Sequence, residues 1–344
     1  MKRNQILVGD VRDRLREIAT GSVDCVVSSP PYLGLRDYGH RSQLGTEADI
    51  DSWVREVCSV GRQLARVLHP HGSWWLNIAD SYSSHPREGA PPKALLLGPQ
   101  RLAIALAEDG WLIRNQIIWA KSNPMPSSVT DRLSATYETV LLLTRAPRYF
   151  FDLDAIRVPA ISHRAPQARR AIRGYPPPTA MPATGRVNRN KGLDRMRRKG
   201  ANAHPLGKSP GDVWTIATAN YRGAHFAAYP LPLAERAVLA GCPERVCTRC
   251  STPWRKAKRR DRGGSERLLR TGALAAQCRC EAGWRPGLVL DPFLGSGTTA
   301  VAAIAHRRDW LGIELNPDYA AIAQERIGQA GTGPPPTPSR EAGG

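Results

Sequence analysis

Hydrophobic and polar residues along the chain follow two alternating patterns. Short apolar runs, typical of buried strands, are followed by segments in which apolar residues recur every three or four positions, as on the covered face of a helix. The predicted strands cover residues 6–8, 23–28, 72–78, 113–119, 138–144, 148–151, 288–290 and 310–313, and regular structure also returns over 211–215. The predicted helices cover residues 11–19, 53–68, 98–108, 233–240, 298–306 and 317–327. This alternation predicts an α/β fold with a largely parallel sheet covered by helices.

Two stretches lack this periodicity. Residues 161–207 are rich in Pro, Gly and Arg and contain one acidic residue, Asp194. The basic residues of this stretch are Arg164, Arg169, Arg170, Arg173, Arg186, Arg189, Lys191, Arg195, Arg197, Arg198 and Lys199. Taken alone, such a segment is typical of a solvated linker, whereas within a nucleic-acid enzyme it favours contact with the polyanion. Residues 331–344 have the composition of a disordered tail.

Composition adds a strong positive charge to this picture. The 344 residues, 41% of them hydrophobic, suffice for one sizeable α/β domain with insertions. Lys and Arg number 49 against 30 Asp and Glu, a formal charge of +19. Such a field attracts a polyanion, although it could also serve solubility or an anionic membrane. Because no run approaches about 18 apolar residues and no signal peptide is visible, we expect a cytoplasmic protein without a membrane partner.

A glycine-rich turn follows the apolar run of residues 288–290. The segment reads LVLDPFLGSGTT and opens a predicted helix, so that glycines allow a ligand close to free backbone N–H groups. Its candidate cofactor-binding residues are Asp291, Phe293, Gly295, Gly297 and Thr299. The next predicted strand ends in Glu314, whose carboxylate can accept both hydroxyls of a ribose. A lone Gly-x-Gly is usually an ordinary turn, but these offsets favour a nucleoside site, and the missing Gly-Lys-Ser/Thr ending disfavours ATP.

A second motif, Ser29-Pro30-Pro31-Tyr32, directly follows the apolar run of residues 23–28. In a parallel sheet the carboxyl ends of the strands form the ligand crevice, so this loop should face the glycine turn. An exocyclic amine on a base is a poor nucleophile because its lone pair is delocalised into the ring. If its two N–H groups donated hydrogen bonds to Ser29 Oγ and the Pro30 carbonyl, the lone pair would become available for attack. Tyr32 could stack on the base. A duplex base must be flipped out to reach such a pocket.

Four cysteines have the spacing of a metal site. Cys247 and Cys250 precede a basic segment, WRKAKRRDR, and Cys278 and Cys280 follow it. Four thiolates around a structural zinc ion would hold together an insert that is too small to fold alone. The second pair is spaced Cys-x-Cys, and two alternatives stay open, namely Cys242 as a ligand and free thiols. The basic segment is either a contact for the DNA backbone or a solvated loop.

Together the Ser-Pro-Pro-Tyr loop and the glycine-rich turn resemble the motifs of the amino-methyltransferase family of DNA methyltransferases. Their order, with the Ser-Pro-Pro-Tyr loop before the Phe-x-Gly-x-Gly loop, resembles the circularly permuted beta class. The resemblance extends over LRDYG at residues 35–39, NPMPSSVTDR at 123–132, Tyr137-Glu138, GDVW at 211–214 and YPLPLAER at 229–236. It implies that Asp10 contacts the cofactor adenine and that residues 225–230 close over the methionine end of S-adenosylmethionine.

The resemblance also implies a domain plan, built on a circularly permuted Rossmann-like methyltransferase fold. Residues 1–157 would form its catalytic half, and residues 208–241 with 285–330 its cofactor-binding half. Residues 158–207 would be a target-recognition insert. The cysteine spacing adds a zinc-binding insert resembling a zinc ribbon at 242–284, and composition adds a disordered tail at 331–344. Arginines of the recognition insert could contact phosphates, read guanine edges or fill the gap left by the flipped base.

The sequence therefore predicts a bacterial or phage-encoded enzyme that methylates the exocyclic amine of a flipped base in double-stranded DNA. Ser29 in place of Asp favours cytosine N4 over adenine N6. S-adenosylmethionine is the expected cofactor, and a restriction endonuclease and a second copy of the chain are candidate partners. The alternatives are an adenine N6 enzyme, an RNA methyltransferase, and an inactive DNA-binding protein with the same fold.

Overall fold

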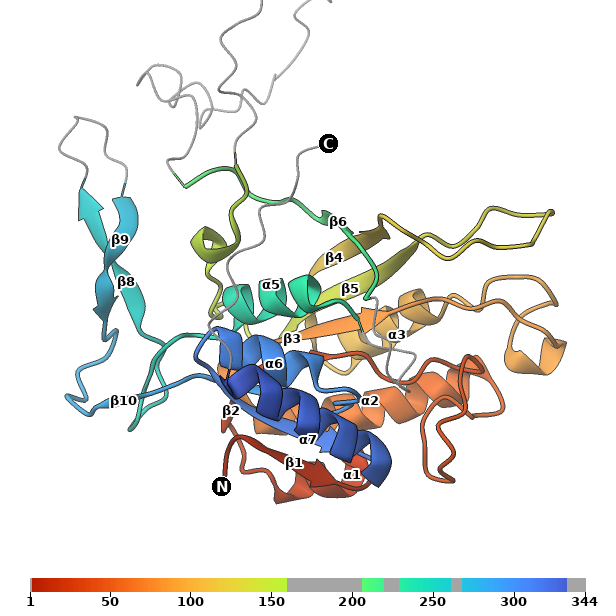
Figure 1. The fold of residues 1–344 in the computed structure, drawn as a ribbon, viewed down its shortest axis with the longest axis horizontal. Coiled ribbons are helices and arrows are strands. Elements are labelled where there is room, and N and C mark those ends of the chain that lie inside the picture. Colours follow the sequence, from red (N-terminus) through yellow and green to blue (C-terminus); the bar gives the residue numbers. More distant parts are fainter. Residues whose placement is uncertain (1, 160–205, 220–228, 261–267, 333–344) are drawn as a thin grey trace, which may run out of the picture.

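An eight-stranded sheet forms the centre of the computed structural model, which describes residues 2–159, 206–219, 229–260 and 268–332 (Figure 1). In spatial order its strands are β1 (Gln5–Val8), β12 (Asp309–Glu314), β11 (Leu288–Asp291), β2 (Val23–Ser28), β3 (Leu68–Ile78), β5 (Tyr137–Thr144), β4 (Leu112–Lys121) and β6 (Val213–Ile216). All neighbours are parallel except that β5 runs antiparallel to both β3 and β4. The prediction of a largely parallel sheet is confirmed.

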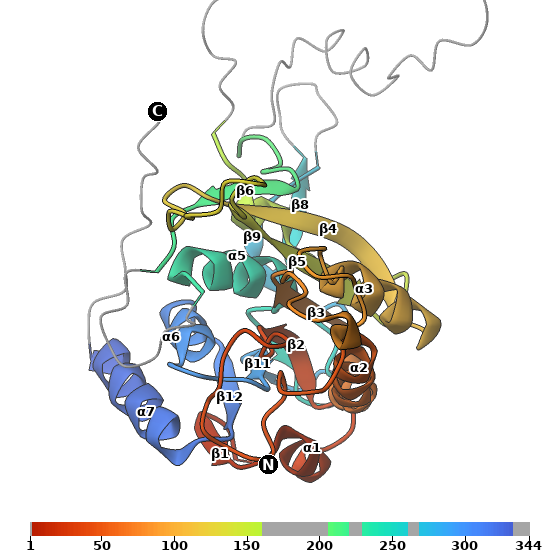
Figure 2. The same cartoon turned by 90° about the vertical axis from the view of Figure 1, so that its right-hand side faces the viewer.

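Helices cover both faces of this sheet (Figure 2). One face carries α1 (Val11–Arg14), α2 (Ile50–Val67) and α3 (Gly98–Glu108), and the other carries α5 (Leu231–Gly241), α6 (Thr298–Ala305) and α7 (Pro317–Thr332). Each face has its own apolar core, because the sheet separates two clusters of buried side chains. Strand β2 is buried along its whole length, as expected for a strand covered on both sides.

Two strands distant in sequence lie side by side at the centre of the sheet. Val289 and Leu290 of β11 pair in parallel with Cys25 and Val26 of β2. Because parallel neighbours end at the same edge, this register brings the residues that follow both strands to one edge of the sheet. The first strand, β1, likewise pairs with β12 near the other end of the described chain.

Several predicted boundaries were wrong. The first helix stops at Arg14 and continues as the 3₁₀ turn η1 (Leu15–Glu17), α2 begins at Ile50, and β3 begins at Leu68 directly after α2. Residues 148–151 form no strand. Their aromatic residues cover the sheet instead: Phe150 is buried, Phe151 stacks on Trp75, and the backbone N–H of Phe150 donates to His71 O.

Shorter elements complete the described chain. Two further 3₁₀ turns are η2 (Pro86–Glu88) and η3 (Leu153–Ile156). Within the cysteine-rich insert, β7 (Val246–Cys247) pairs with β10 (Trp284–Arg285), and β8 (Arg255–Arg260) pairs with β9 (Leu268–Ala275). Much of the basic segment therefore forms a strand and not a loop, in a hairpin that projects from the body of the molecule (Figure 1).

Some expectations concern residues outside the described ranges. Most of the predicted recognition insert, residues 225–228 of the expected methionine-end segment, and nearly all of the tail fall there. Among the described helices, none is long and apolar enough to cross a membrane.

Candidate active site and cysteine cluster

A cavity of about 810 Å³ opens at the carboxyl ends of β2, β3, β11 and β12. It is lined by all four residues of the predicted catalytic loop and by four of the predicted cofactor-binding residues. These lining residues are Ser29, Pro30, Pro31, Tyr32, Asp10, Phe293, Gly295 and Glu314. The structure therefore brings together in one cavity two motifs that are more than half the chain apart.

Glu314 closes the glycine-rich turn. Its Oε2 accepts the backbone N–H of Gly295 at 2.8 Å and its Oε1 accepts that of Asn316 at 3.0 Å. Gly295 and Gly297 have φ of +52° and +81°, the left-handed region that side chains disfavour, which explains glycine at both positions. Burial raises the pKa of Glu314. The carboxylate thus holds the turn in shape at the wall of the cavity.

Asp291 supports the same turn from behind. Its Oδ1 accepts the N–H of Phe293 at 3.0 Å, and its Oδ2 accepts the hydroxyls of Tyr229, at 3.0 Å, and Thr299. Burial raises the pKa of Asp291 to about 6. Asp291, Gly297 and Thr299 are not among the described residues that line the cavity, so the structure places them beneath its wall. Tyr229 was missed as a member of this group, although the sequence places it in the YPLPLAER segment.

Asp10 lies at the cavity and also caps a helix. Its Oδ1 accepts the backbone N–H of Arg12 at 2.9 Å, and the side chains form an ion pair at 2.6 Å. Hydrogen bonding from Arg12 lowers the pKa of Asp10.

The predicted catalytic loop is held by a partner on the helical face. Trp53 of α2, fully buried, donates its indole N–H to the Pro31 carbonyl at 2.9 Å. Ser29 Oγ lies 2.8 Å from the hydroxyl of Tyr32. That hydroxyl enters a polar cluster, so Tyr32 has a second role besides the expected stacking on a base.

Three residues to which the sequence assigned no role complete this cluster, although Glu138 belongs to the Tyr137-Glu138 pair that contributes to the family resemblance. Asn77 is the last residue but one of β3, Glu138 is the second residue of β5, and Lys121 ends β4. Glu138 accepts the Tyr32 hydroxyl at 3.0 Å and Asn77 Nδ2 at 2.7 Å, and it pairs with Lys121 at 2.8 Å. A signal was present in the sequence, because each of these polar residues lies at one end of an apolar strand.

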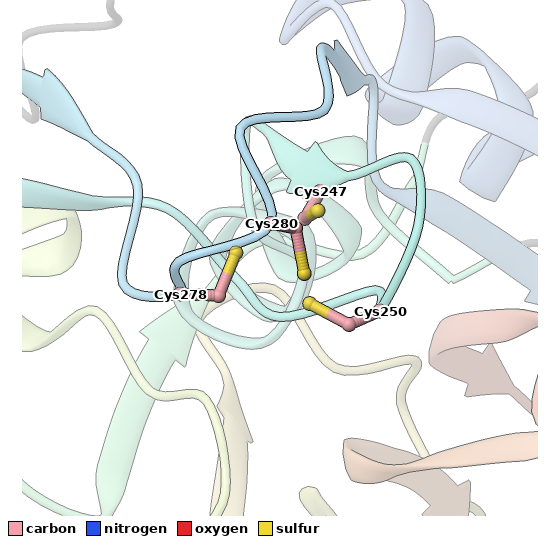
Figure 3. A group of neighbouring side chains, drawn as sticks. All are labelled: Cys247, Cys250, Cys278 and Cys280. Atoms are coloured by element: carbon pink, nitrogen blue, oxygen red, sulfur yellow. The ribbon is translucent and has the colours of Figure 1, made fainter.

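The four predicted cysteine ligands converge (Figure 3). The four Sγ atoms lie within 4.8 Å of one another; they belong to Cys247, Cys250, Cys278 and Cys280. Cys250 Sγ lies 3.1 Å from Thr252 Oγ1, and hydrogen bonding with Thr252 lowers the pKa of Cys250 to about 6, which favours the thiolate. The buried Cys242 is not part of the group. This donor set suits a soft, tetrahedrally coordinated metal ion.

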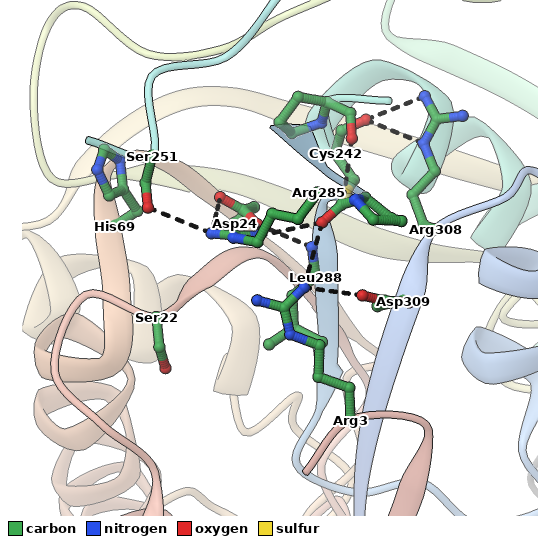
Figure 4. Close-up of polar contacts among 12 residues, drawn as sticks. Arg3, Ser22, Asp24, His69, Cys242, Ser251, Arg285, Leu288, Arg308 and Asp309 are labelled. Atoms are coloured by element: carbon green, nitrogen blue, oxygen red, sulfur yellow. Dashed lines mark hydrogen bonds and ion pairs between the residues drawn. The ribbon is translucent and has the colours of Figure 1, made fainter. Parts of the chain in front are cut away.

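The cysteine-rich insert is joined to the sheet by a buried ion pair (Figure 4). Arg285 of β10 donates to Asp24 of β2 at 2.6 Å and reaches Ser251 Oγ at 3.3 Å. Asp24 also accepts the N–H of Leu288, the first residue of β11, at 2.8 Å. One carboxylate therefore connects the insert to the starts of both central strands.

Comparison with known proteins identifies this arrangement. A family model described as DNA methylase, covering N6 and N4 methyltransferases, matches residues 23–325. The chain belongs to this family. The Type II methyltransferase M.SmaI of Serratia marcescens is 32% identical over 94% of this chain and 90% of its own. M.Cfr9I of Citrobacter freundii is 31% identical over 93% and 86%, and M.SfiI of Streptomyces fimbriatus is 46% identical over 49% and 42%.

Solved structures share the fold. The PvuII DNA methyltransferase, described as cytosine-N4-specific, has a TM-score of 0.57 at 16% identity over 96% of this chain and 92% of its own. A DNA modification methylase of Thermus thermophilus has a TM-score of 0.52 at 22% identity over 96% of both chains, and that protein has also been solved with S-adenosyl-L-methionine. The expectation of a methyltransferase fold is thereby confirmed, and the chain is a DNA amino-methyltransferase.

Proposed function

We propose that this methyltransferase transfers a methyl group from S-adenosylmethionine to N4 of a cytosine flipped out of duplex DNA. The observation that carries the proposal is the single cavity lined by both Ser29 and the glycine-rich turn. Serine at position 29 supports cytosine over adenine. Met125 and Leu133 line the same cavity and are 85% and 89% exposed, so its mouth offers apolar surface to an aromatic base.

We assign the cofactor to the part of the cavity beside the glycine turn. Glu314 would accept the ribose hydroxyls, Asp10 would contact the adenine, and Phe293 and Gly295 would pack against the nucleoside. Asp291, Gly297 and Thr299 would act indirectly by holding the turn in shape. When bound, S-adenosylmethionine supplies an electrophilic methyl group on a sulfonium centre.

The catalytic loop would activate the amine of the base. Ser29 Oγ and the Pro30 carbonyl would accept hydrogen bonds from its two N–H groups, which favours a pyramidal nitrogen with a lone pair free for attack. The rigid loop fixes that nitrogen in line with the methyl group, so the rate gain comes mainly from positioning. Tyr32 contacts the base, and Pro31 fixes the loop through its bond to Trp53.

The test is digestion of methylated duplex DNA to nucleosides followed by mass spectrometry. The wild-type protein, Ser29→Ala and Gly295→Trp are incubated with methyl-labelled S-adenosylmethionine and DNA of diverse sequence. We expect labelled N4-methylcytosine that both substitutions abolish. N6-methyladenine would overturn the choice of base and leave the mechanism in place. Label on RNA alone, or no label at all, would overturn the proposed function in favour of an RNA enzyme or an inactive DNA-binding protein.

We further propose that the four clustered cysteines bind one structural zinc ion. Ligands at a zinc–sulfur distance of about 2.3 Å in a tetrahedron lie about 3.8 Å apart, close to the observed grouping. Metal analysis of the purified protein should give one zinc per chain, with zinc lost in Cys250→Ser and retained in the control Cys58→Ser. A metal-free wild-type protein would instead support free thiols.

Other parts of the proposal depend on residues or partners beyond the described structure. The domain boundaries given above, with residues 158–207 as the recognition insert, stay predictions. A partner endonuclease, a homodimer and a cytoplasmic location stay predictions as well.

A further inference from the structure

Five polar side chains from four parts of the chain form one hydrogen-bonded group at the cavity. Ser29 and Tyr32 follow β2, and Asn77, Glu138 and Lys121 come from β3, β5 and β4. The antiparallel strand β5 makes this meeting possible, because it lies between β3 and β4 in the sheet. The sequence assigned no role to Glu138, which lies at the centre of the group.

The hydrogen bonds of this group have a defined direction. The Glu138 carboxylate, paired with Lys121 at 2.8 Å, can only accept. Tyr32 has a single hydroxyl proton, and its shortest contact with an acceptor-only group is Glu138 Oε2 at 3.0 Å. Asn77 Nδ2 donates to that same oxygen at 2.7 Å and reaches the Tyr32 hydroxyl oxygen at 3.0 Å. The Tyr32 proton is therefore committed to Glu138.

This direction determines what Ser29 offers to the cavity. Ser29 Oγ lies 2.8 Å from the Tyr32 hydroxyl, whose own proton is already donated, so Ser29 donates its proton to Tyr32. Burial, and then the charge of Glu138, raise the pKa of Tyr32 well above its ordinary value, so Tyr32 stays protonated near neutral pH. Only lone pairs of Ser29 remain for a ligand.

We propose that Glu138 is a positioning residue that, through Tyr32, orients the Ser29 hydroxyl as a hydrogen-bond acceptor for the amine of the target base. This inference rests on the proposed function, because it concerns how Ser29 meets an N–H group. With the opposite direction of donation, Ser29 would point its own proton at the amine, and the contact would become repulsive. Glu138 thus acts on the base without touching it.

The test is Glu138→Gln. The amide of Gln can donate to Tyr32, which lets the hydroxyls of Tyr32 and Ser29 reverse. We expect kcat to fall about 100-fold, while KM for DNA and the Kd of S-adenosylmethionine change less than about threefold, since the lost interaction is made at the reacting amine. The matched control is Glu235→Gln, which removes a comparably buried carboxylate paired with His306 away from the cavity and should keep the wild-type kcat.

A second variant separates this effect from a folding defect. Glu138→Gln leaves Lys121 without its partner, so Glu138→Gln/Lys121→Met is measured in parallel; it removes the unpaired charge and should still have the low kcat. A double-mutant cycle with Tyr32→Phe tests the route, because Glu138→Gln should cost little further activity once the Tyr32 hydroxyl is gone.

Three results would overturn the proposal. They are an unchanged kcat in Glu138→Gln, a full recovery of kcat in the double variant with Lys121→Met, and an additive loss with Tyr32→Phe. A wild-type protein that does not methylate DNA would overturn the proposed function itself, and that failure is seen before any variant is compared.

Discussion

At the scale of single residues, the sequence predicted where the carboxylates of the candidate site lie in the sheet, but it did not predict their contacts. Glu314 and Asp291 were both predicted to belong to the cofactor site, from their places at the ends of apolar runs. Their hydrogen bonds show that each also holds the glycine-rich turn. Asn77 and Glu138 were not predicted to have a role, because a single polar residue at the end of a buried strand has many ordinary explanations.

Asp291 should make the stability of the cofactor-free protein depend on pH. Its pKa is about 6 in the fold against about 3.9 in an unfolded chain, so the unfolded chain loses its proton first and stability falls as pH rises from about 4 to about 6. Asp291→Asn does not titrate and lacks this loss. When the pH is raised from 5 to 8, its free energy of unfolding relative to that of the wild type should therefore increase by about 1 kcal/mol. Urea denaturation at both pH values measures this difference, and a pH-independent difference would contradict it.

Trp53 should matter to activity through one hydrogen bond. Trp53→Phe keeps a ring in the core but leaves the Pro31 carbonyl without its donor, which should cost about 1–3 kcal/mol of stability and lower kcat. The control is Trp111→Phe, since Trp111 is equally buried and its indole nitrogen has no hydrogen-bond partner among the described residues. Steady-state kinetics and urea denaturation compare the two variants. Equal losses of kcat would show that ring volume, and not the loop contact, is responsible.

At the scale of elements, the pattern of apolar positions predicted most strands and helices, while the ends of elements depended on packing. Strand β2 and helix α3 agree with the predicted ranges, because β2 ends at the polar pair Ser28-Ser29 and α3 begins with a proline in its first turn. Residues 148–151 have a strand-like composition but pack as a covering segment, since burial of aromatic rings does not require a neighbouring strand. The pairing of β8 with β9 was not predicted either, because the charged residues of the basic segment do not form the apolar pattern of a buried strand.

The ion pair between Arg285 and Asp24 should anchor the cysteine-rich insert. Arg285→Ala leaves Asp24, which is only 3% exposed, without its cation, and should destabilise the fold by about 3–5 kcal/mol. Asp24→Asn/Arg285→Met removes both charges and should recover much of this loss. Chemical denaturation of the three proteins gives the comparison. If Arg285→Ala were at least as stable as Asp24→Asn/Arg285→Met, the ion pair would not join the insert to the sheet.

At the scale of the whole molecule, the net charge of +19 should govern DNA affinity. Each phosphate contact releases counterions, so the logarithm of the binding constant should fall linearly with the logarithm of salt concentration, by about 0.9 per contact. Replacing Arg189, Arg195 and Arg197 by Gln should reduce the slope by about 3 if all three contact phosphates. Arg16→Gln, an exposed site on α1–η1, is the control. Fluorescence anisotropy with labelled duplex measures both slopes, and an unchanged slope would remove these arginines from the interface.

The sequence by itself determined the alternation of strands and helices, the glycine-rich turn, the Ser-Pro-Pro-Tyr loop and the four cysteines. These features depend on local patterns, in which residue type and spacing fix backbone geometry or chemistry. Only the tertiary structure decided that β11 lies beside β2, that β5 runs antiparallel between β3 and β4, and that Glu138 therefore reaches Tyr32. The Tyr32–Glu138 contact joins residues 106 positions apart, and the pairing of β2 with β11 joins residues still further apart. These contacts depend on how the whole sheet buries its two faces, which no local pattern records.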